Sequence, residues 1–282
     1  RDLVSYISDS FLSKLSILLL TCYRGWAVGG AAAMTAVLGF AIIGPQWRSD
    51  PVTIETSAVM TAYTSERGEI KTITLADQSK VTLGARTKLD VVMTDSERRI
   101  KLASGAAKFD VKSNPDRPFV VEAENFTATV MGTIFDVRSS AGIVRLSVAE
   151  GEVEVTHPFI VNDAPTSMMT KRRIFAGQKV TATPTDGLSQ TEDLKLEDFA
   201  TWREARLRYQ GATLAELIAD ANRYSAREII LSDELQTFSE DRATMIFDGS
   251  DVERLLRSLP ILFPVNIEDS GEGAIEITAR PQ

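Results

Sequence analysis

The stretch KTITLADQSKVTLGARTKLDVVM, residues 71–93, decides the fold of the larger part of this chain. Apolar and polar side chains alternate in short runs, and the turn-forming residues 76–79 (ADQS) separate the first run from the second. A period of two over about four to six residues predicts β-strands with one buried face, joined by tight turns. The apolar positions are Ile73, Leu75, Val81, Leu83, Leu89, Val91 and Met93.

The same alternation continues to about Gln178, interrupted by turn signals at residues 104–105, 114–116 and 150–151. Turns that recur roughly every 8–12 residues are typical of an all-β domain, which we place at residues 68–190. A sandwich, a barrel and a stacked solenoid all fit this pattern. Residues 156–170 are expected to form an exposed excursion, and the basic cluster 171–173 a solvated strand edge.

A charge-free apolar segment precedes this domain, WAVGGAAAMTAVLGFAIIGPQW at residues 26–47. About 19 helical residues span roughly 29 Å, close to the ~30 Å hydrocarbon core of a bilayer, and tryptophans at both ends favour the headgroup layer. We therefore predict one transmembrane helix, with a buried core helix and a signal peptide as the alternatives. Lys14 and Arg24 before the span, against Arg48 after it, favour a cytoplasmic N-terminus.

The span divides the remaining N-terminal sequence into a short cytoplasmic segment, residues 1–25, and a linker, residues 48–67. Because the sequence opens without a methionine, we expect it to begin inside a longer chain.

After Gly187 the pattern changes to helical spacing, and we predict a small α+β domain at residues 194–282. Thr213 with Glu216 forms a capping box ahead of one amphipathic helix. Ser250 with Glu253 forms a second capping box, ahead of a helix that Pro260 is expected to end. The expected order is strand, helix, strand, strand, helix, strand, strand. Two helices covering one face of a small mixed sheet is the economical packing, because each helix has one apolar stripe to bury.

Composition excludes several functions. The net charge of −8 over 282 residues argues against a nucleic-acid partner, which needs clustered Lys and Arg. The single histidine, His157, is expected in a loop, and the single cysteine, Cys22, lies beside the span. We therefore expect no metal site, no cofactor and no catalytic residues, hence no enzyme.

Paired carboxylates are the remaining place where catalysis could be carried out. The pairs Asp95/Glu97, Glu122/Glu124 and Glu152/Glu154 each lie on one strand face and could serve an envelope hydrolase. Solvated faces of strands in an acidic protein are the favoured interpretation.

Several short motifs occur in a specific order and closely resemble the FecR family of membrane-bound sigma-factor regulators. They are GE at 68–69, ITLADQSKVTL at 73–83, RPFVV at 117–121, GTIFDV at 132–137, VAEGEV at 148–153, AGQ at 176–178 and ANRYS at 221–225. The sequence has Gln78 where the family usually has glycine, and Ala107 where it usually has an acidic residue. Residues 1–25 show no match to the family's cytoplasmic region.

The resemblance implies a single-pass inner-membrane signal transducer whose C-terminal domains are periplasmic. Such proteins regulate an extracytoplasmic-function sigma factor and receive a signal from the signalling domain of a TonB-dependent outer-membrane receptor, often with proteolysis near and within the span. The α+β domain is similar to the secretin and TonB N-terminal modules. On this interpretation the candidate partner-binding residues are Leu214, Leu217, Arg223 and Tyr224. The alternative is a membrane-anchored periplasmic scaffold or glycan-binding module.

Overall fold

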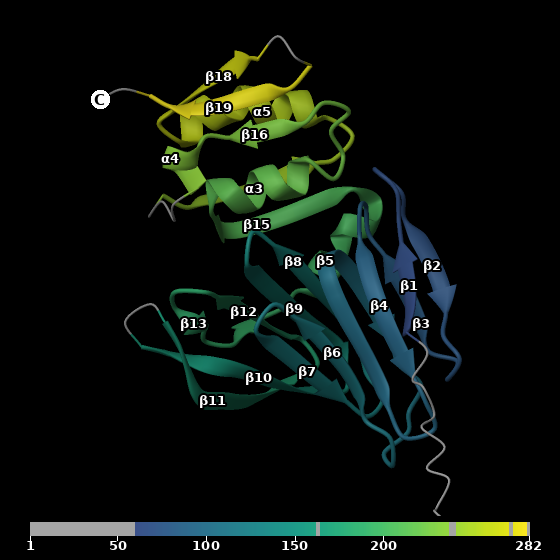
Figure 1. The fold of residues 1–282 in the computed structure, drawn as a ribbon. Helices are drawn as coiled ribbons and strands as arrows, with labels where there is room; N and C mark the ends of the chain where they lie inside the picture. The colour runs from purple at the N-terminus through teal and green to yellow at the C-terminus, as the bar shows by residue number, and fades with distance from the viewer. Residues whose placement is uncertain (1–59, 162–163, 237–240, 271–272, 281–282) are drawn as a thin grey trace, which may run out of the picture. The chain divides into compact units, whose positions relative to one another are not determined.

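The computed structural model describes residues 60–161, 164–236, 241–270 and 273–280 (Figure 1). The predicted membrane span, the segment before it and most of the linker lie outside these residues. Within the described part of the chain, every helix is too short or too polar to cross a bilayer.

Fourteen strands of the described residues form one continuous, nearly closed sheet, and all of them precede Leu194. They are β1 (Met60–Thr64), β2 (Lys71–Thr74), β3 (Lys80–Leu83), β4 (Lys88–Met93), β5 (Arg98–Asp110), β6 (Phe119–Ala123), β7 (Phe126–Val130), β8 (Ile134–Ser140), β9 (Ile143–Glu150), β10 (Glu152–Val161), β11 (Ala164–Phe175), β12 (Gln178–Thr183), β13 (Gly187–Leu188) and β14 (Glu192–Asp193). We call this part the β domain, and it confirms the predicted all-β region.

The long strand β5 belongs to both halves of the sheet. Its first part pairs with β4 and β6, and the half-sheet continues through β7 and β10 to β11. Its second part pairs with β3 and β8, and this half continues through β9 to β12. Among the strand pairings of the described residues in the β domain, β5 with β6 is parallel and the others are antiparallel. This pattern is that of a sandwich-like fold and differs from a parallel solenoid.

Strand β5 is sharply bent at Gly105. A straight strand from Arg98 to Lys112 would span about 46 Å, yet the Arg98 Nη1 donates to the carbonyl of Lys112 at 2.9 Å. Gly105 has φ +108°, and a Cβ at this position would lie 2.2 Å from the Thr87 Oγ1. The Thr87 hydroxyl in turn bridges both backbone groups of Ala106 at 3.1 Å. The two half-sheets therefore diverge from Gly105 and face each other.

Replacing Gly105 by alanine is expected to lower the free energy of unfolding by roughly 2–3 kcal/mol, because the new Cβ meets Thr87 and the backbone is in a region that favours glycine. Urea denaturation followed by circular dichroism measures the loss. Gly177 provides the control, since it also has positive φ but open space around it. Equal losses at the two positions would show that the contact with Thr87 carries no weight.

The core of the β domain consists of the alternating apolar residues that the sequence predicted. Val81, Leu83, Leu89 and Ile100 are fully buried. Phe109 stacks on Phe135 with 5.0 Å between ring centroids. One continuous cluster thus lies between the two half-sheets.

The hairpin of β10 and β11 corrects two predictions. The predicted excursion at residues 156–170 lies mostly within these strands, although Phe159 and Met168 are more than half exposed. His157 is in strand β10 and not in a loop, and it is 4% exposed because it faces inward. The basic cluster lies on β11, at the end of the sheet order, and the side chains of Lys171 and Arg173 are each 64% exposed. The Lys171 Nζ pairs with the Glu154 Oε1 at 2.6 Å.

The remaining elements form the α+β part, which we call the C-terminal domain. They are η1 (Leu196–Asp198), η2 (Thr201–Glu204), β15 (Arg206–Ala212), α3 (Leu214–Ala221), β16 (Ile229–Leu231), α4 (Asp233–Gln236), β17 (Ala243–Asp248), α5 (Val252–Leu262), β18 (Val265–Asp269) and β19 (Ile275–Ala279). The predicted order of strands and helices is confirmed, with the short helix α4 added.

Two details of the C-terminal domain differ from prediction. Its strands form two small sheets, β15–β17 and β16–β19–β18, and not one mixed sheet. Helix α5 is capped by Asp251, which accepts from the Arg254 amide, and it continues past Pro260 to Leu262. The capping of α3 is as predicted, because the Thr213 hydroxyl accepts from the Glu216 amide at 3.0 Å.

Candidate functional site

Helix α3 places two acidic side chains against the β domain. Glu216 and Asp220 are four residues apart, so they share one face of the helix, and they are 1% and 2% exposed. Their partners are arginines on β8 and β9, which the strand period directs away from the β-domain core. We call this contact the junction.

Asp220 is the centre of the junction. Its carboxylate accepts from the Arg138 Nη2 at 2.7 Å, the Tyr209 hydroxyl at 2.6 Å, the Arg223 Nε at 3.1 Å and the Ser140 hydroxyl. Burial opposes ionisation of Asp220, but the charges of Arg138 and Arg223 outweigh it and hold its pKa below the ordinary value. Burial, and next the Asp220 charge, raise the pKa of Tyr209. The group at the centre is therefore an ionised, fully paired carboxylate.

Glu216 makes the second ion pair of the junction. The Arg145 Nε and Nη2 donate to its two carboxylate oxygens at 2.7 and 2.9 Å, a bidentate arrangement. The remaining Arg145 Nη1 donates to the Thr181 hydroxyl at 3.3 Å, so strand β12 also supports the arginine.

Backbone groups join the two domains as well. Arg223, just after α3, donates from Nη1 to the Arg86 carbonyl and from Nη2 to the Ser139 carbonyl, each at 3.0 Å. Arg86 reciprocates by donating to the Asn222 carbonyl at 3.0 Å. The Gly68 amide donates to the Arg223 carbonyl at 3.1 Å. The junction is thus a built interface between domains.

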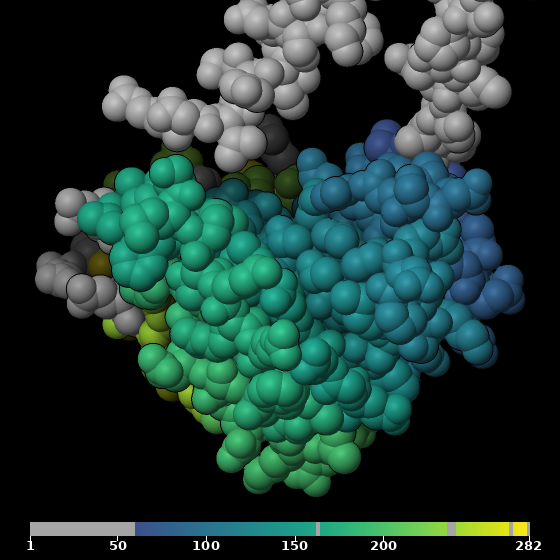
Figure 2. Space-filling view, turned by 90° about the horizontal axis from the view of Figure 1, so that it is seen from below, coloured from purple at the N-terminus to yellow at the C-terminus, as the bar shows by residue number. Residues whose placement is uncertain are grey.

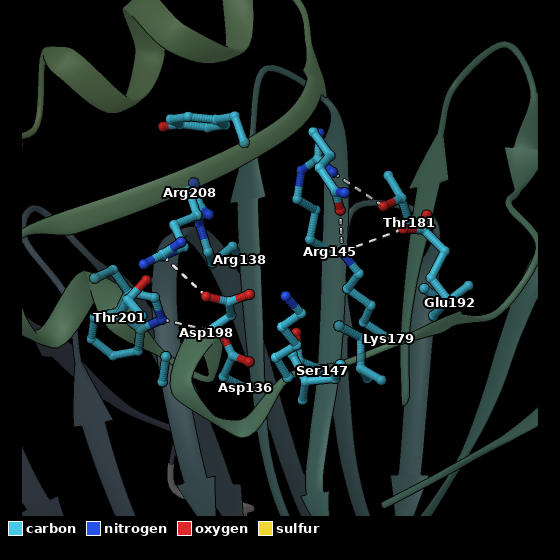
Figure 3. Close-up of a pocket in the computed structure, with 18 of the residues that line it drawn as sticks. Asp136, Arg138, Arg145, Ser147, Lys179, Thr181, Glu192, Asp198, Thr201 and Arg208 are labelled. Atoms are coloured by element: carbon cyan, nitrogen blue, oxygen red, sulfur yellow. Dashed lines mark hydrogen bonds and ion pairs between the residues drawn. The ribbon is translucent and has the colours of Figure 1, made fainter. Parts of the chain in front are cut away.

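Beside the junction lies a cavity of about 540 Å³, bounded by β8, β9 and β12 on one side and by the 192–202 segment, β15 and β17 on the other (Figure 3). Four of its lining cations are engaged by acids: Arg138 and Arg145 by the junction, Arg208 by Asp198 at 3.0 Å, and Lys179 by Glu192 at 3.3 Å. The cavity therefore has a mixed and largely compensated charge.

The predicted carboxylate pairs lie apart from this cavity. Glu97 and Glu122 both pair with Arg99, which is 44% exposed, and Glu152 and Glu154 pair with exposed cations of β11. Of the three pairs only Glu152/Glu154 lies on one strand, because Asp95 and Glu97 lie in the turn between β4 and β5 and Glu124 in the turn after β6. Exposed ion pairs of this kind fit solvated surface positions. Among the described residues, no group of three or more His, Cys, Asp or Glu is arranged to hold a metal ion.

The predicted partner-binding residues lie in and around helix α3. Leu214 and Leu217 are in the core of the C-terminal domain, 3% and 0% exposed. Arg223 is part of the junction, and the half-buried Tyr224 packs edge-to-face on Phe247 with centroids 6.0 Å apart. In this arrangement the two leucines offer no surface to a partner, and partner binding through this group stays a prediction.

Apart from Arg223, which was predicted as a partner-binding residue, sequence reasoning missed the residues that make the junction. A signal for two of them was present. Glu216 and Asp220 each stand directly before a residue of the apolar stripe, Leu217 and Ala221, so they border the face of the predicted helix that is expected to be buried. Their arginine partners lie more than 70 residues earlier in the chain. Pairing at that separation is not visible in any local pattern.

The fold and the junction define a protein in which a nearly closed β domain is locked to an α+β domain by buried ion pairs. Comparison with known proteins gives a family match for the first part. Residues 61–154 match the family model described as FecR protein.

Two solved structures share the fold. Both are crystal structures of a "putative anti-sigma factor" from Parabacteroides distasonis ATCC 8503, and each is 20% identical to this chain. They cover 79% and 78% of this chain and 100% of their own, with TM-scores of 0.64 and 0.63. The shared fold thus extends well beyond the FecR segment. No curated protein matches the chain.

Proposed function

We propose that this protein is a single-pass inner-membrane regulator of an extracytoplasmic-function sigma factor, acting through protein contacts. The observation that carries the proposal is the FecR match at residues 61–154, together with a fold shared over the full length of a protein described as an anti-sigma factor. The charge-free segment at residues 26–47 supports the membrane anchor.

We further propose that the β and C-terminal domains are periplasmic and receive their signal from the signalling domain of a TonB-dependent receptor. The strand and helix order of the C-terminal domain supports this, because it fits the resemblance to secretin and TonB N-terminal modules. In this role the C-terminal domain contacts the receptor. Membrane proteases then cleave the chain near and within the span.

The position of the junction supports a relay through the β domain. Met60 pairs with Val92, which pairs with Arg99 at the start of β5, whereas the junction residue Ser139 pairs with Gly105. The part of β5 between Arg99 and Gly105 is about 20 Å long. Figure 2, seen from below Figure 1, shows a face formed almost entirely by residues coloured blue to green, which belong mainly to the β domain. A force on the C-terminal domain could reach Met60 along β1 from the contact of Gly68 with Arg223, or through the pairing of β4 with β5.

The proposal predicts a specific partner. Co-expression of the full chain with each extracytoplasmic-function sigma factor of its source cell, read by a promoter reporter for each factor, is expected to change the activity of one factor at least fivefold.

Lysine substitutions of Ile261 and Leu262, both exposed on α5, test whether the C-terminal domain transmits the receptor signal. We expect the inducing nutrient to lose its effect on the reporter while basal regulation persists.

The control is an equally drastic change away from the C-terminal domain, Phe159→Lys on the β10–β11 hairpin, which we expect to leave induction intact. If no sigma factor responds while binding of the full chain to peptidoglycan is measurable, the regulator is excluded and a glycan-binding module takes its place.

A further inference from the structure

Asp136 of strand β8 is a buried carboxyl group that the contacts described above do not satisfy. It is 4% exposed, and its Oδ2 accepts from the Trp202 Nε1 at 3.1 Å. The Ser147 hydroxyl, opposite Asp136 in the register of β9, also acts on the carboxyl group, but the Asp136 Oδ1 has no partner of hydrogen-bond geometry within the described ranges. One of the two carboxyl oxygens is therefore removed from water without replacement of its hydrogen bonds, which is costly for a charged group.

Trp202 belongs to the segment that leads into the C-terminal domain. It lies in η2, four residues before the start of β15, and it is 2% exposed. A Cβ on Gly84 would lie 3.0 Å from the Trp202 Cε3 atom, so the indole lies close against the β domain at a place where a larger residue would crowd it. The ring thus ties the connecting segment to the β domain by packing and by the bond to Asp136.

The cavity described above adjoins this contact, since both Asp136 and Trp202 line it (Figure 3). Charged groups of several neighbouring elements surround the carboxyl group: Arg138 on β8, Lys108 opposite it in the register of β5, Arg203 on η2, Asp198 on η1, Lys179 on β12 and Arg208 on β15. Arg138 and Arg203 are the cations whose charges lower the pKa of Asp136, and Arg138 is already engaged by Asp220. Lifting the indole would open Asp136 to water through this cavity.

We propose that Asp136 and Trp202 form a proton-dependent latch, which holds the connecting segment against the β domain when Asp136 is protonated and loosens when Asp136 ionises. The latch lies outside the ion pairs of the junction and acts independently of any partner.

The direction of the pH dependence follows from the burial of Asp136. Burial is the main cause that raises its pKa from 3.8 to about 6, against the smaller opposing effects of the Trp202 hydrogen bond and the Arg138 charge. In a loosened arrangement the hydrated carboxyl group would return toward 3.8, so the latched form binds the proton more tightly. The latch therefore weakens as pH rises, by about tenfold in its open-to-closed ratio between pH 5 and pH 8.

Hydrogen exchange of the full chain tests the latch. The rates for residues 199–205 are measured by mass spectrometry at several pH values in the wild type and in Asp136→Asn, which keeps an oxygen acceptor for the indole but cannot ionise. The ratio of the two rates at each pH cancels the intrinsic pH dependence of exchange. We expect the ratio of the wild-type rate to the Asp136→Asn rate to rise about tenfold from pH 5 to pH 8.

The hairpin of β6 and β7 is the internal reference, because it lies in the β-domain core and belongs to the half-sheet opposite that of Asp136. A constant ratio at 199–205, or an equal rise in the β6–β7 hairpin, would overturn the latch. Should Asp136→Asn fail to fold, the wild type alone decides. Its exchange at 199–205, divided by that of the β6–β7 hairpin, must then show the same tenfold rise.

Discussion

Replacing Asp220 by alanine is expected to lower the free energy of unfolding by about 3–5 kcal/mol, because the change leaves buried cations without their partner. Arg138 and Arg223 are each 12% exposed and both donate to this carboxylate, as does the buried Tyr209 hydroxyl. Urea denaturation with circular dichroism detection measures the loss. Asp220→Asn, which keeps acceptor capacity and removes the charge, is expected to lose less.

Two comparisons separate the junction from a general effect of the substitution. Glu253→Ala removes an exposed carboxylate from helix α5 and is expected to change stability by less than about 0.5 kcal/mol. A double-mutant cycle of Asp220→Ala with Arg138→Met is expected to give a coupling energy of at least about 1 kcal/mol. A coupling near zero would mean that the short contact in the structure contributes nothing to stability.

The second large effect is expected at Arg98, where methionine should lower the free energy of unfolding by about 3–5 kcal/mol. Arg98 is 1% exposed and pairs with Asp77 at 3.0 Å. It also donates to the carbonyls of Lys112, Asn114 and Arg117 at 2.9, 3.2 and 2.7 Å. Methionine fills much of the volume but leaves Asp77 and three backbone carbonyls without these donors.

Arg99 is the matched control for this substitution. It is the next residue of the same strand, but it is 44% exposed and pairs with Glu97 and Glu122 at the surface. Arg99→Met is expected to cost less than about 1 kcal/mol, since exposed ion pairs contribute little. Similar losses for the two variants would show that the buried bonds of Arg98 to Asp77 and to the carbonyls of the 112–117 segment contribute no more to stability than surface ion pairs do.

The turn at residues 76–79 shows how far local sequence can be taken. The pattern predicted a turn, and Asp77 makes it by accepting from the Ser79 amide at 3.0 Å and from its hydroxyl at 2.7 Å. Gln78 takes positive φ there, where a glycine would be unstrained. The second role of Asp77, as the partner of Arg98, depends on a residue 21 positions later that only the folded chain brings near.

The α+β part shows a similar division. The helix start at Thr213 was predictable because the capping hydroxyl and the amide that donates to it, that of Glu216, are only three residues apart. The split of its strands into two sheets was not, because strand pairing is fixed by contacts between segments distant in sequence. Pro260 was expected to end α5, yet the helix includes it, so this local rule was outweighed by the surrounding contacts of the helix.

By itself, the sequence determined the alternation of buried and exposed residues, the turns between strands and the order of elements, because these follow from side-chain period and local hydrogen bonding. The tertiary structure alone decided the bend of β5 at Gly105, the pairing of Asp220 and Glu216 with arginines of β8 and β9, and the burial of Asp136 beneath Trp202. Each of these joins groups far apart in the chain. Their energies come from removing charges and polar atoms from water, which no single segment can do.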